Sequence, residues 1–310
     1  MTLTVLFAAS NDNWHQYGAP LEKALRREFA DVHLVTSAKP ETVDYIVYAP
    51  TSSLQDFTPY TSAKAVLSLW AGVESIVTNE TLTMPLVRMV DPGMTRSMTA
   101  WVTGHVLRYH LGMDAHINNP DHRWEPESPP FIGNRQVCIL GLGALGQAAA
   151  VALRDLGFAV SGWSRRAKEI KGVTTFSGHE GLAQALSSAE IVVLLMPDTA
   201  DTENTLNEET LAMLPFGAKI INPGRGPLID DAALIAALDS GRVGHATLDV
   251  FRTEPLPKDH PYWAHPNVTV TPHIAAETNA DSASQVIAET IRLSEDSAPL
   301  PNLVDRGRGY

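Results

Sequence analysis

The sequence is poor in cysteine, in basic residues and in long apolar runs. Its 310 residues include a single cysteine, Cys138, which excludes an internal disulfide and a cysteine-rich zinc or iron–sulfur site. Lysine and arginine total 23 against 35 aspartate and glutamate residues, a formal net charge of −12. This acidic balance argues against nucleic acid as a partner, because polyanion-binding surfaces are usually basic. The apolar run at residues 191–197 is far shorter than the ~20 residues that a helix needs to cross a bilayer, so no membrane association is expected.

The amino-terminal segment also lacks basic residues ahead of its short apolar stretch. We therefore interpret residues 4–8 as a first strand and not as a signal peptide. Together with the lone cysteine, this favours a reducing, cytoplasmic location. Apolar residues make up 44% of the chain and charged residues 19%, which is typical of an ordinary globular protein. A length of 310 residues predicts about two domains at the usual ~150 residues each.

Short apolar runs alternate with helical stretches along most of the chain. In the first hundred residues, strands are predicted at 4–8, 32–35, 45–48 and 65–69, with a helix at 21–29. Asp91-Pro-Gly93 breaks this pattern ahead of a connecting helix at 99–111 and a proline-rich surface loop at 118–130. A second series follows, with strands at 137–140, 159–162, 191–195, 218–221, 245–250 and 268–270, and a final helix at 279–293. Such alternation predicts parallel βαβ units, so the expected fold class is α/β with two doubly wound parallel-sheet domains.

A glycine fingerprint stands between the first strand and the first helix of the second series. Gly141, Gly143 and Gly146 match the pattern G-x-G-x-x-G, with Ala144 and Leu145 opening the predicted helix. The strand–turn–helix context is the one that a dinucleotide site requires. Gly141 permits the tight turn, Gly143 lets the backbone approach a pyrophosphate, and Gly146 allows the helix to pack closely on the strand. A turn that needs glycine for its conformation only is the alternative. Cys138 lies inside the preceding strand, which favours packing over chemistry.

The residues after the second strand of this series indicate which dinucleotide is bound. An NAD site usually carries an acidic residue there, which bonds the ribose hydroxyls. In this sequence the strand at 159–162 is followed by Ser164, Arg165 and Arg166, with no acid. Guanidinium groups attract a 2′-phosphate, so the sequence predicts NADP(H) as the preferred cofactor and leaves NAD(H) open. A solvated basic loop is the alternative.

Three polar segments in the second half follow predicted strands. They carry Arg225, Glu254 and His273, and ligands of wound α/β sheets bind outside the carboxyl ends of the strands. Spacing alone does not show that these side chains meet, and each taken singly would more often be a surface residue. Eleven histidines are present, but there is no H-E-x-x-H pattern and no cysteine pair, so no dedicated metal site is expected.

The chain resembles the D-isomer-specific 2-hydroxyacid dehydrogenases over essentially its whole length. Within that family it is most similar to the glyoxylate/hydroxypyruvate reductases. Five motifs carry the resemblance by their order and spacing: residues 70–73 (WAGV), 141–146 (GLGALG), 222–226 (NPGRG), 249–257 (DVFRTEPLP) and 271–275 (TPHIA).

The resemblance implies how the chain is divided. Residues 1–98 and 277–310 would form a flavodoxin-like substrate (catalytic) domain, and residues 99–276 a Rossmann dinucleotide-binding domain. The active site would lie in the cleft between them. The connecting helix from Thr99, with the proline-rich loop after it, matches the region through which this family forms dimers, so a homodimer is expected from the resemblance alone.

The resemblance also implies roles for the polar residues. Arg225 would hold the substrate carboxylate and polarise the keto group, which suits a planar, permanently charged guanidinium. His273 would be the general acid in reduction, since histidine exchanges protons near neutral pH. Glu254 would bond the imidazole and favour its protonated form. The remaining substrate contacts would come from Trp70, Ala71, Gly72 and Val73, although Trp70 could equally be a core residue.

Further cofactor contacts are implied at the ends of strands. They are Met196, Pro197, Pro223, Gly224, Asp249, His273 and Ala275. For Asp249 a structural role at the strand end is an equal alternative, and Met196-Pro197 could be a simple turn.

The sequence therefore predicts an NADPH-dependent reductase that converts small 2-keto acids, glyoxylate and hydroxypyruvate first, to 2-hydroxy acids. One alternative keeps the enzyme and assigns it a bulkier 2-keto acid. Another is a non-enzymatic, dinucleotide-sensing co-regulator on the same fold, because such relatives can retain the same site residues. The chain lacks a long disordered tail, which leans against the second alternative.

Overall fold

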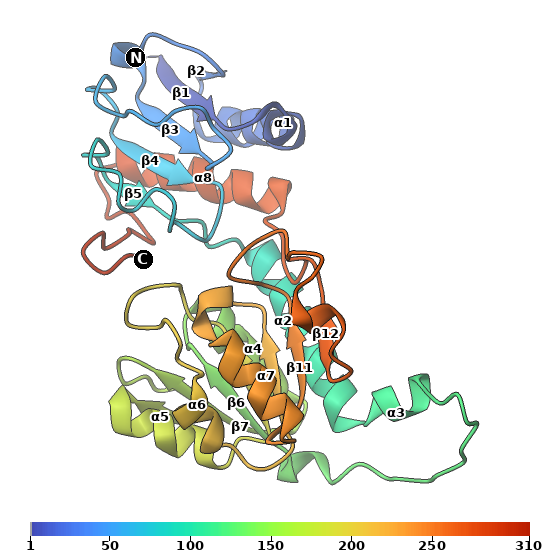
Figure 1. Cartoon of the computed structure of the whole chain (residues 1–310). Coiled ribbons are helices and arrows are strands. Elements are labelled where there is room, and N and C mark those ends of the chain that lie inside the picture. Colours follow the sequence, from blue (N-terminus) through green and yellow to red (C-terminus); the bar gives the residue numbers. More distant parts are fainter. Residues whose placement is uncertain (1) are drawn as a thin grey trace. The chain divides into compact units, whose positions relative to one another are not determined.

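The chain divides into two compact units (Figure 1). The structure is a computed structural model that describes residues 2–310. Residues 2–94 and 277–310 form the first unit, and Thr95–Ala276 form the second. All pairs of named strands among the described residues run parallel. The prediction of an α/β fold with two doubly wound parallel sheets is confirmed.

The first unit is built on a five-stranded sheet of order β2-β1-β3-β4-β5, an order of the flavodoxin type. Its strands are β1 (Leu3–Ala8), β2 (Val32–Val35), β3 (Tyr45–Tyr48), β4 (Ala65–Ser68) and β5 (Leu86–Val87). Its helices are α1 (Asn11–Glu28), the short η1 (Pro40–Thr42) and α8 (Ala280–Glu295). One face of the sheet packs against α1 and α8. The other face is covered by loop residues that include Phe57, Ile76 and Leu82.

The second unit is built on a seven-stranded sheet of order β12-β11-β10-β9-β6-β7-β8. Its strands are β6 (Gln136–Leu140), β7 (Ala159–Ser164), β8 (Thr174–Ser177), β9 (Ile191–Leu194), β10 (Ala218–Asn222), β11 (Val243–Leu248) and β12 (Val268–Val270). Its helices are α2 (Pro92–His110, whose first residues lie in the first unit), α3 (Met113–Ile117), α4 (Ala144–Asp155), α5 (Gly178–Ser187), α6 (Glu208–Ala212) and α7 (Asp231–Asp239), with short turns η2 (Ile132–Asn134), η3 (Gly226–Leu228) and η4 (Pro261–Trp263).

Helices cover both faces of this second sheet. Buried residues of α2 and α4 pack on one face, and those of α5, α6 and α7 pack on the other. The strand order reverses between β6 and β9, which is the topological switch point where ligands of such sheets bind. The fold therefore places the glycine turn after β6 at the expected cofactor crevice.

Two helices begin earlier than the sequence pattern predicted. α1 starts at Asn11 and not at residue 21, because the Ser10 hydroxyl accepts a hydrogen bond from the Asn13 amide (3.2 Å) and caps it. α2 starts at Pro92 and not at residue 99. Proline is tolerated at the first helical position, and the Asp91 carboxylate accepts from Gly93 N (3.0 Å) and Met94 N (2.8 Å). The Asp91-Pro-Gly93 break is thus the start of a helix.

Cys138 is fully buried in β6. Burial raises the pKa of its thiol to about 12, which leaves it protonated and unreactive near neutral pH. Its role is packing. Across residues 2–310, no helix combines the length and the apolar character that crossing a bilayer requires.

Candidate active site

The three polar segments meet at one edge of the second sheet. β10, β11 and β12 are neighbours, and their last residues pair in register, Asn222 with Leu248 and Leu248 with Val270. Arg225, Glu254 and His273 follow these three strand ends. The carboxyl ends of parallel strands form the ligand-binding edge of a wound sheet, so these side chains share the edge that chemistry would use.

Glu254 and His273 form a direct pair. The Glu254 Oε2 atom lies 2.7 Å from His273 Nδ1, and the Phe251 amide donates to Glu254 Oε1 over 2.9 Å. A hydrogen bond at Nδ1 orients the imidazole and leaves Nε2 as the atom that exchanges a proton. The His273 side chain is 51% exposed and the Glu254 side chain 36% exposed, so both reach solvent, and a substrate could reach Nε2.

Asp249 builds the loop that presents His273. Its side chain is fully buried and accepts hydrogen bonds from Thr271 Oγ1 (2.5 Å), Ile274 N (2.9 Å) and Ala275 N (2.9 Å). Its carbonyl oxygen accepts from His273 N (2.9 Å). His273 has a φ of +54°, a left-handed conformation that is uncommon for residues other than glycine. The hydrogen bonds to Asp249 hold this conformation, which supports the structural alternative for Asp249. One carboxylate accepts up to about four hydrogen bonds, so a cofactor contact stays open.

The loop that carries Arg225 is ordered by Asn222. This buried side chain donates from Nδ2 to the Arg225 carbonyl (2.9 Å) and accepts from Gly224 N at Oδ1 (3.1 Å). The Arg225 guanidinium in turn donates to the Gly224 carbonyl over 2.7 Å. A β-carbon on Gly224 would lie 2.8 Å from the Leu194 carbonyl oxygen, so only glycine fits there. Asn222 is a site residue to which the sequence reasoning assigned no role.

Gly226 brings the Arg225 loop against the Glu254 loop. A β-carbon at Gly226 would lie 2.0 Å from the carbonyl carbon of Phe251 and 2.3 Å from the amide nitrogen of Arg252. The two backbones therefore touch at this point, and any side chain at residue 226 would push them apart. The contact fixes the position of the segment ahead of Glu254 relative to the segment that carries Arg225.

The three glycines of the turn after β6 meet three different requirements. Gly141 has a φ of +104°, and a β-carbon there would meet the Leu195 backbone at 2.6 Å. A β-carbon on Gly146 would lie 1.8 Å from the Gly141 carbonyl oxygen, so this position is closed by packing of helix on turn. Gly143 has no atom within 4 Å of an added β-carbon. The open space at Gly143, at the amino end of α4, fits the approach of a pyrophosphate to backbone N–H groups.

The basic loop after β7 is exposed and connected to the turn. The Arg165 guanidinium lies 3.4 Å from an Asp201 carboxylate oxygen, and the Ser164 hydroxyl donates to the Arg166 carbonyl (2.7 Å). The Lys168 ammonium donates to the Leu142 carbonyl, inside the glycine turn. This cation beside the turn adds to the positive charge that a dinucleotide phosphate would meet.

The other predicted cofactor residues lie at the same edge. Met196 is buried, and its backbone nitrogen would be 2.8 Å from a β-carbon on Gly141, so the end of β9 adjoins the glycine turn. The Pro197 carbonyl accepts from Thr202 Oγ1 (2.7 Å), which fits a turn. Pro223 lies between Asn222 and Gly224, and Ala275 is buried next to the His273 loop.

The predicted substrate loop of the first unit follows β4. The Trp70 side chain is 38% exposed and Val73 is buried. The Trp70 carbonyl accepts from Ser68 Oγ (2.9 Å) and from the Met89 amide (3.3 Å). Within residues 2–310, the amides of Ala71, Gly72 and Val73 donate to no protein acceptor. Backbone N–H groups without a partner in this unit are suited to receive a carboxylate.

The described part of the chain holds no group of three or more His, Cys, Asp or Glu side chains arranged to bind a metal ion.

Comparison with known proteins points in one direction. Residues 105–275 match the family described as the NAD-binding domain of D-isomer specific 2-hydroxyacid dehydrogenases. A glyoxylate/hydroxypyruvate reductase A of Yersinia enterocolitica is 40% identical over 255 residues, which cover 80% of this chain and 82% of that protein. A second relative with the same name, from Serratia proteamaculans, is also 40% identical over 255 residues.

Solved structures agree over the full length. A D-isomer specific 2-hydroxyacid dehydrogenase from Xanthobacter autotrophicus Py2, in complex with NADPH and MES, aligns with a TM-score of 0.91 at 38% identity and covers 100% of both chains. An NADPH-dependent glyoxylate/hydroxypyruvate reductase from Sinorhizobium meliloti, in complex with NADP and sulfate, aligns with a TM-score of 0.87 at 33% identity over 100% of both chains.

Proposed function

This chain belongs to the D-isomer specific 2-hydroxyacid dehydrogenases, and we propose that it reduces glyoxylate and hydroxypyruvate to their 2-hydroxy acids with NADPH. It is an oxidoreductase of this family. The observation that carries the proposal is the Glu254–His273 pair at the strand edge shared with Arg225. Relatives named glyoxylate/hydroxypyruvate reductase support the substrate class. They do not favour a bulkier keto acid or a non-enzymatic co-regulator.

Arg225 is suited to hold the substrate. A 2-keto acid carries a carboxylate, and a guanidinium matches it with two parallel N–H donors. The Asn222 hydrogen bonds fix the backbone on both sides of Gly224, so the Arg225 side chain departs from an ordered loop. Reduction builds negative charge on the keto oxygen, and a cation placed beside that oxygen lowers the barrier. The amides of Ala71, Gly72 and Val73 would bind the carboxylate from the first unit.

His273 is suited to deliver the proton. Its Nδ1 is engaged by Glu254, so Nε2 is the atom that donates to the keto oxygen in reduction and accepts from the hydroxyl in oxidation. The carboxylate of Glu254, itself held by the Phe251 amide, fixes the orientation of the imidazole ring. Removing His273 therefore removes the proton donor, and removing Glu254 removes the group that orients it.

The cofactor residues fit NADP(H). The open space at Gly143 admits a pyrophosphate, and Arg165 and Arg166 offer charge to a 2′-phosphate where an acidic residue would serve NAD. Bound here, the nicotinamide supplies the hydride, while the protein supplies position and electrostatics. Structural relatives that contain NADPH or NADP support this preference, and NAD(H) stays open as a weaker alternative.

We also propose a cytoplasmic homodimer. The segment from the end of α2 through α3 to η2 projects from the body of the second unit (Figure 1). It exposes large apolar side chains: Leu111, Met113, Ile117, Trp124 and Phe131. The Trp124 side chain is 94% exposed, and clusters of this kind usually mark an interface. The lone, buried Cys138 supports a reducing compartment. Light scattering of the chain would overturn the dimer if it gave the monomer mass of 33.6 kDa.

A panel of 2-keto acids of increasing size, assayed with NADPH and NADH, tests the function. We expect the highest kcat/KM with glyoxylate or hydroxypyruvate and NADPH. Arg225→Lys keeps a cation but loses the two-pronged geometry, so KM for the keto acid should rise about 10–100-fold. His273→Asn should reduce kcat by about 10²–10⁴-fold. Wild-type rates in both variants would contradict the proposed roles.

A further inference from the structure

We propose that Arg252 is the positioning residue that holds Glu254 against His273, by fastening the segment at residues 251–254 to the turn that follows Arg225. The inference rests on the proposed function, in which Glu254 acts through His273. In the described part of the chain, no hydrogen bond or ion pair joins the Arg252 side chain to Glu254 or His273. Its role would be to fix the place from which Glu254 reaches the imidazole.

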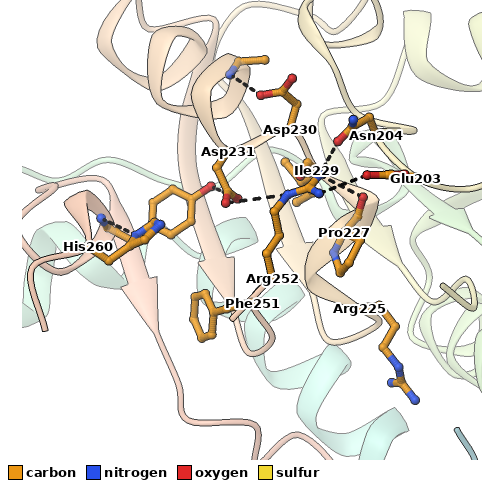
Figure 2. Close-up of polar contacts among 12 residues, drawn as sticks. Glu203, Asn204, Arg225, Pro227, Ile229, Asp230, Asp231, Phe251, Arg252 and His260 are labelled. Carbon is orange, nitrogen blue, oxygen red and sulfur yellow. Dashed lines mark hydrogen bonds and ion pairs between the residues drawn. The ribbon is translucent and has the colours of Figure 1, made fainter. Parts of the chain in front are cut away.

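The Arg252 guanidinium sits in a cluster of oxygen atoms from three segments (Figure 2). The cluster comprises Glu203 Oε1 (3.3 Å), Asn204 Oδ1, the carbonyl oxygens of Pro227 (3.3 Å) and Ile229 (2.8 Å), and Asp231 Oδ2 (3.8 Å). The Arg225 side chain points away from this cluster in the same view. Arg252 is therefore committed to protein acceptors, while Arg225 is directed elsewhere.

The contacts of Arg252 join the two loops of the active site. Pro227 lies in η3, which directly follows Arg225, and Ile229 ends that turn. Arg252 lies between Phe251, whose amide bonds Glu254, and Glu254 itself. At Gly226 the backbones of the two loops already touch. The guanidinium thus closes a second connection between the loop of Glu254 and the loop of Arg225.

The Glu254–His273 pair depends on the position of the segment that carries Glu254, because both side chains are open to water. The Glu254 side chain is 36% exposed and that of His273 51% exposed, and pairs open to water are weak on their own. Within residues 2–310, the Glu254 carboxylate contacts the Phe251 amide and the His273 imidazole. Arg252 directly follows Phe251, so by holding its own segment it would hold the Phe251 amide that supports the Glu254 carboxylate.

The acceptors around Arg252 require an arginine. Its planar group presents five N–H donors in a fixed fork, whereas lysine has one compact ammonium with three donors. Asp231 is held from its other side by the Tyr262 hydroxyl (2.8 Å). Burial and the Asp231 carboxylate raise the pKa of Tyr262, so this hydroxyl stays a donor. Arg252→Lys should consequently restore the charge and only part of the anchoring.

The response to a lysine at this position separates positioning from simple electrostatics. If Arg252 only supplied positive charge, Arg252→Lys should restore the wild-type rate, since lysine keeps the charge. If Arg252 positions Glu254, Arg252→Lys should restore only part of the rate, because one ammonium cannot reach all of the acceptors.

The decisive experiment compares Arg252→Met with Arg242→Met. Arg242 is a matched control, because it donates to the Leu214 carbonyl (3.1 Å) and lies against Phe216, outside the active-site loops. For Arg252→Met we expect both kcat and kcat/KM for glyoxylate with NADPH to fall about tenfold. Arg242→Met should leave both unchanged. In an Arg252→Met/Glu254→Gln double variant, the arginine change should add no further loss, because both act through one contact.

NMR of ¹³C-labelled histidine provides a readout that does not depend on turnover. His273→Asn identifies the His273 resonance, whose chemical shift should move in Arg252→Met in the same direction as in Glu254→Gln and should keep the wild-type value in Arg242→Met. An unchanged chemical shift in Arg252→Met, or additive losses in the double variant, would overturn the inference. If the wild-type protein turned over no keto acid, the proposed function would fail, and the NMR comparison would still decide whether Arg252 positions Glu254.

Discussion

Alanine substitutions distinguish Gly143, a glycine required for ligand binding, from Gly146, a glycine required for folding. An added β-carbon at Gly143 meets no atom within 4 Å, whereas at Gly146 it would lie 1.8 Å from the Gly141 carbonyl oxygen. The space at Gly143 is where the backbone would approach the cofactor pyrophosphate. Gly143→Ala should therefore keep its stability and bind the dinucleotide poorly, whereas Gly146→Ala should lose stability.

The magnitudes follow from these two environments. At Gly143 the backbone has φ −71°, which alanine adopts freely. Alanine lowers the entropy of the unfolded chain, which stabilises the fold, but it is a poorer helix cap than glycine, which destabilises it. The net change in the free energy of unfolding should therefore stay within about 0.5 kcal/mol, or ~2 °C in Tm for a unit of this size. At Gly146 the overlap is with backbone and cannot be relieved by a rotamer change, so we expect a loss of about 3 kcal/mol or more, or at least ~6 °C.

Thermal unfolding and NADPH titration by fluorescence measure the two effects. A methyl group in the path of the pyrophosphate should cost about 2–3 kcal/mol of binding energy, which raises Kd for NADPH roughly 30–150-fold. Two results would refute the reasoning. One is wild-type NADPH affinity in Gly143→Ala, and the other is a Tm loss in Gly143→Ala as large as that in Gly146→Ala.

Three further predictions concern the cofactor loop, the His273 loop and a buried histidine. Replacing Arg165 and Arg166 together with alanine should raise KM for NADPH about 100-fold or more, since two charge-assisted contacts at roughly 1.5–3 kcal/mol each total about 3–6 kcal/mol, and should leave KM for NADH nearly unchanged in steady-state assays. Asp249→Asn turns an amide N–H₂ toward one of three donors, so unfolding experiments should show a loss of about 1–3 kcal/mol, accompanied by a lower kcat. Burial lowers the pKa of His245 to about 4, while in the unfolded chain it is about 6.5. The unfolded state therefore takes up the extra proton between these values, and stability should fall as pH falls through that range. His245→Asn, which retains an acceptor for the Tyr109 hydroxyl, should flatten this dependence in urea titrations at several pH values.

The sequence predicted the elements whose patterns are strong and local. Parallel sheets buried on both faces yield continuous apolar runs such as residues 191–194, so the strands of both sheet cores were recognisable. The short, half-exposed strand β8 and the two-residue strand β5 were missed, because neither has enough apolar residues to show a period. The first ten residues of α1 were missed because polar residues dominate there and the helix depends on the Ser10 cap and on packing by Tyr17.

The candidate catalytic residues could be predicted from motifs, but the residues that hold their loops in place could not. Nothing in the spacing of Asp249 reveals that its carboxylate holds three donors of the His273 loop. Arg252 lies inside the motif at residues 249–257, but the sequence gives it no distinguishing signal, because its acceptors come from residues up to 49 positions away. Contacts of this kind are set by the meeting of loops in three dimensions, and a single sequence contains no period or turn signal for them.

The most direct measurement of the central claim is kcat/KM of the wild-type protein for glyoxylate. It is taken with NADPH and with NADH at the same cofactor concentration, pH and salt. We predict turnover with both and a preference for NADPH of at least about tenfold, the value expected from one charge-assisted contact to the 2′-phosphate. A preference for NADH, or no turnover with either cofactor, would contradict the account.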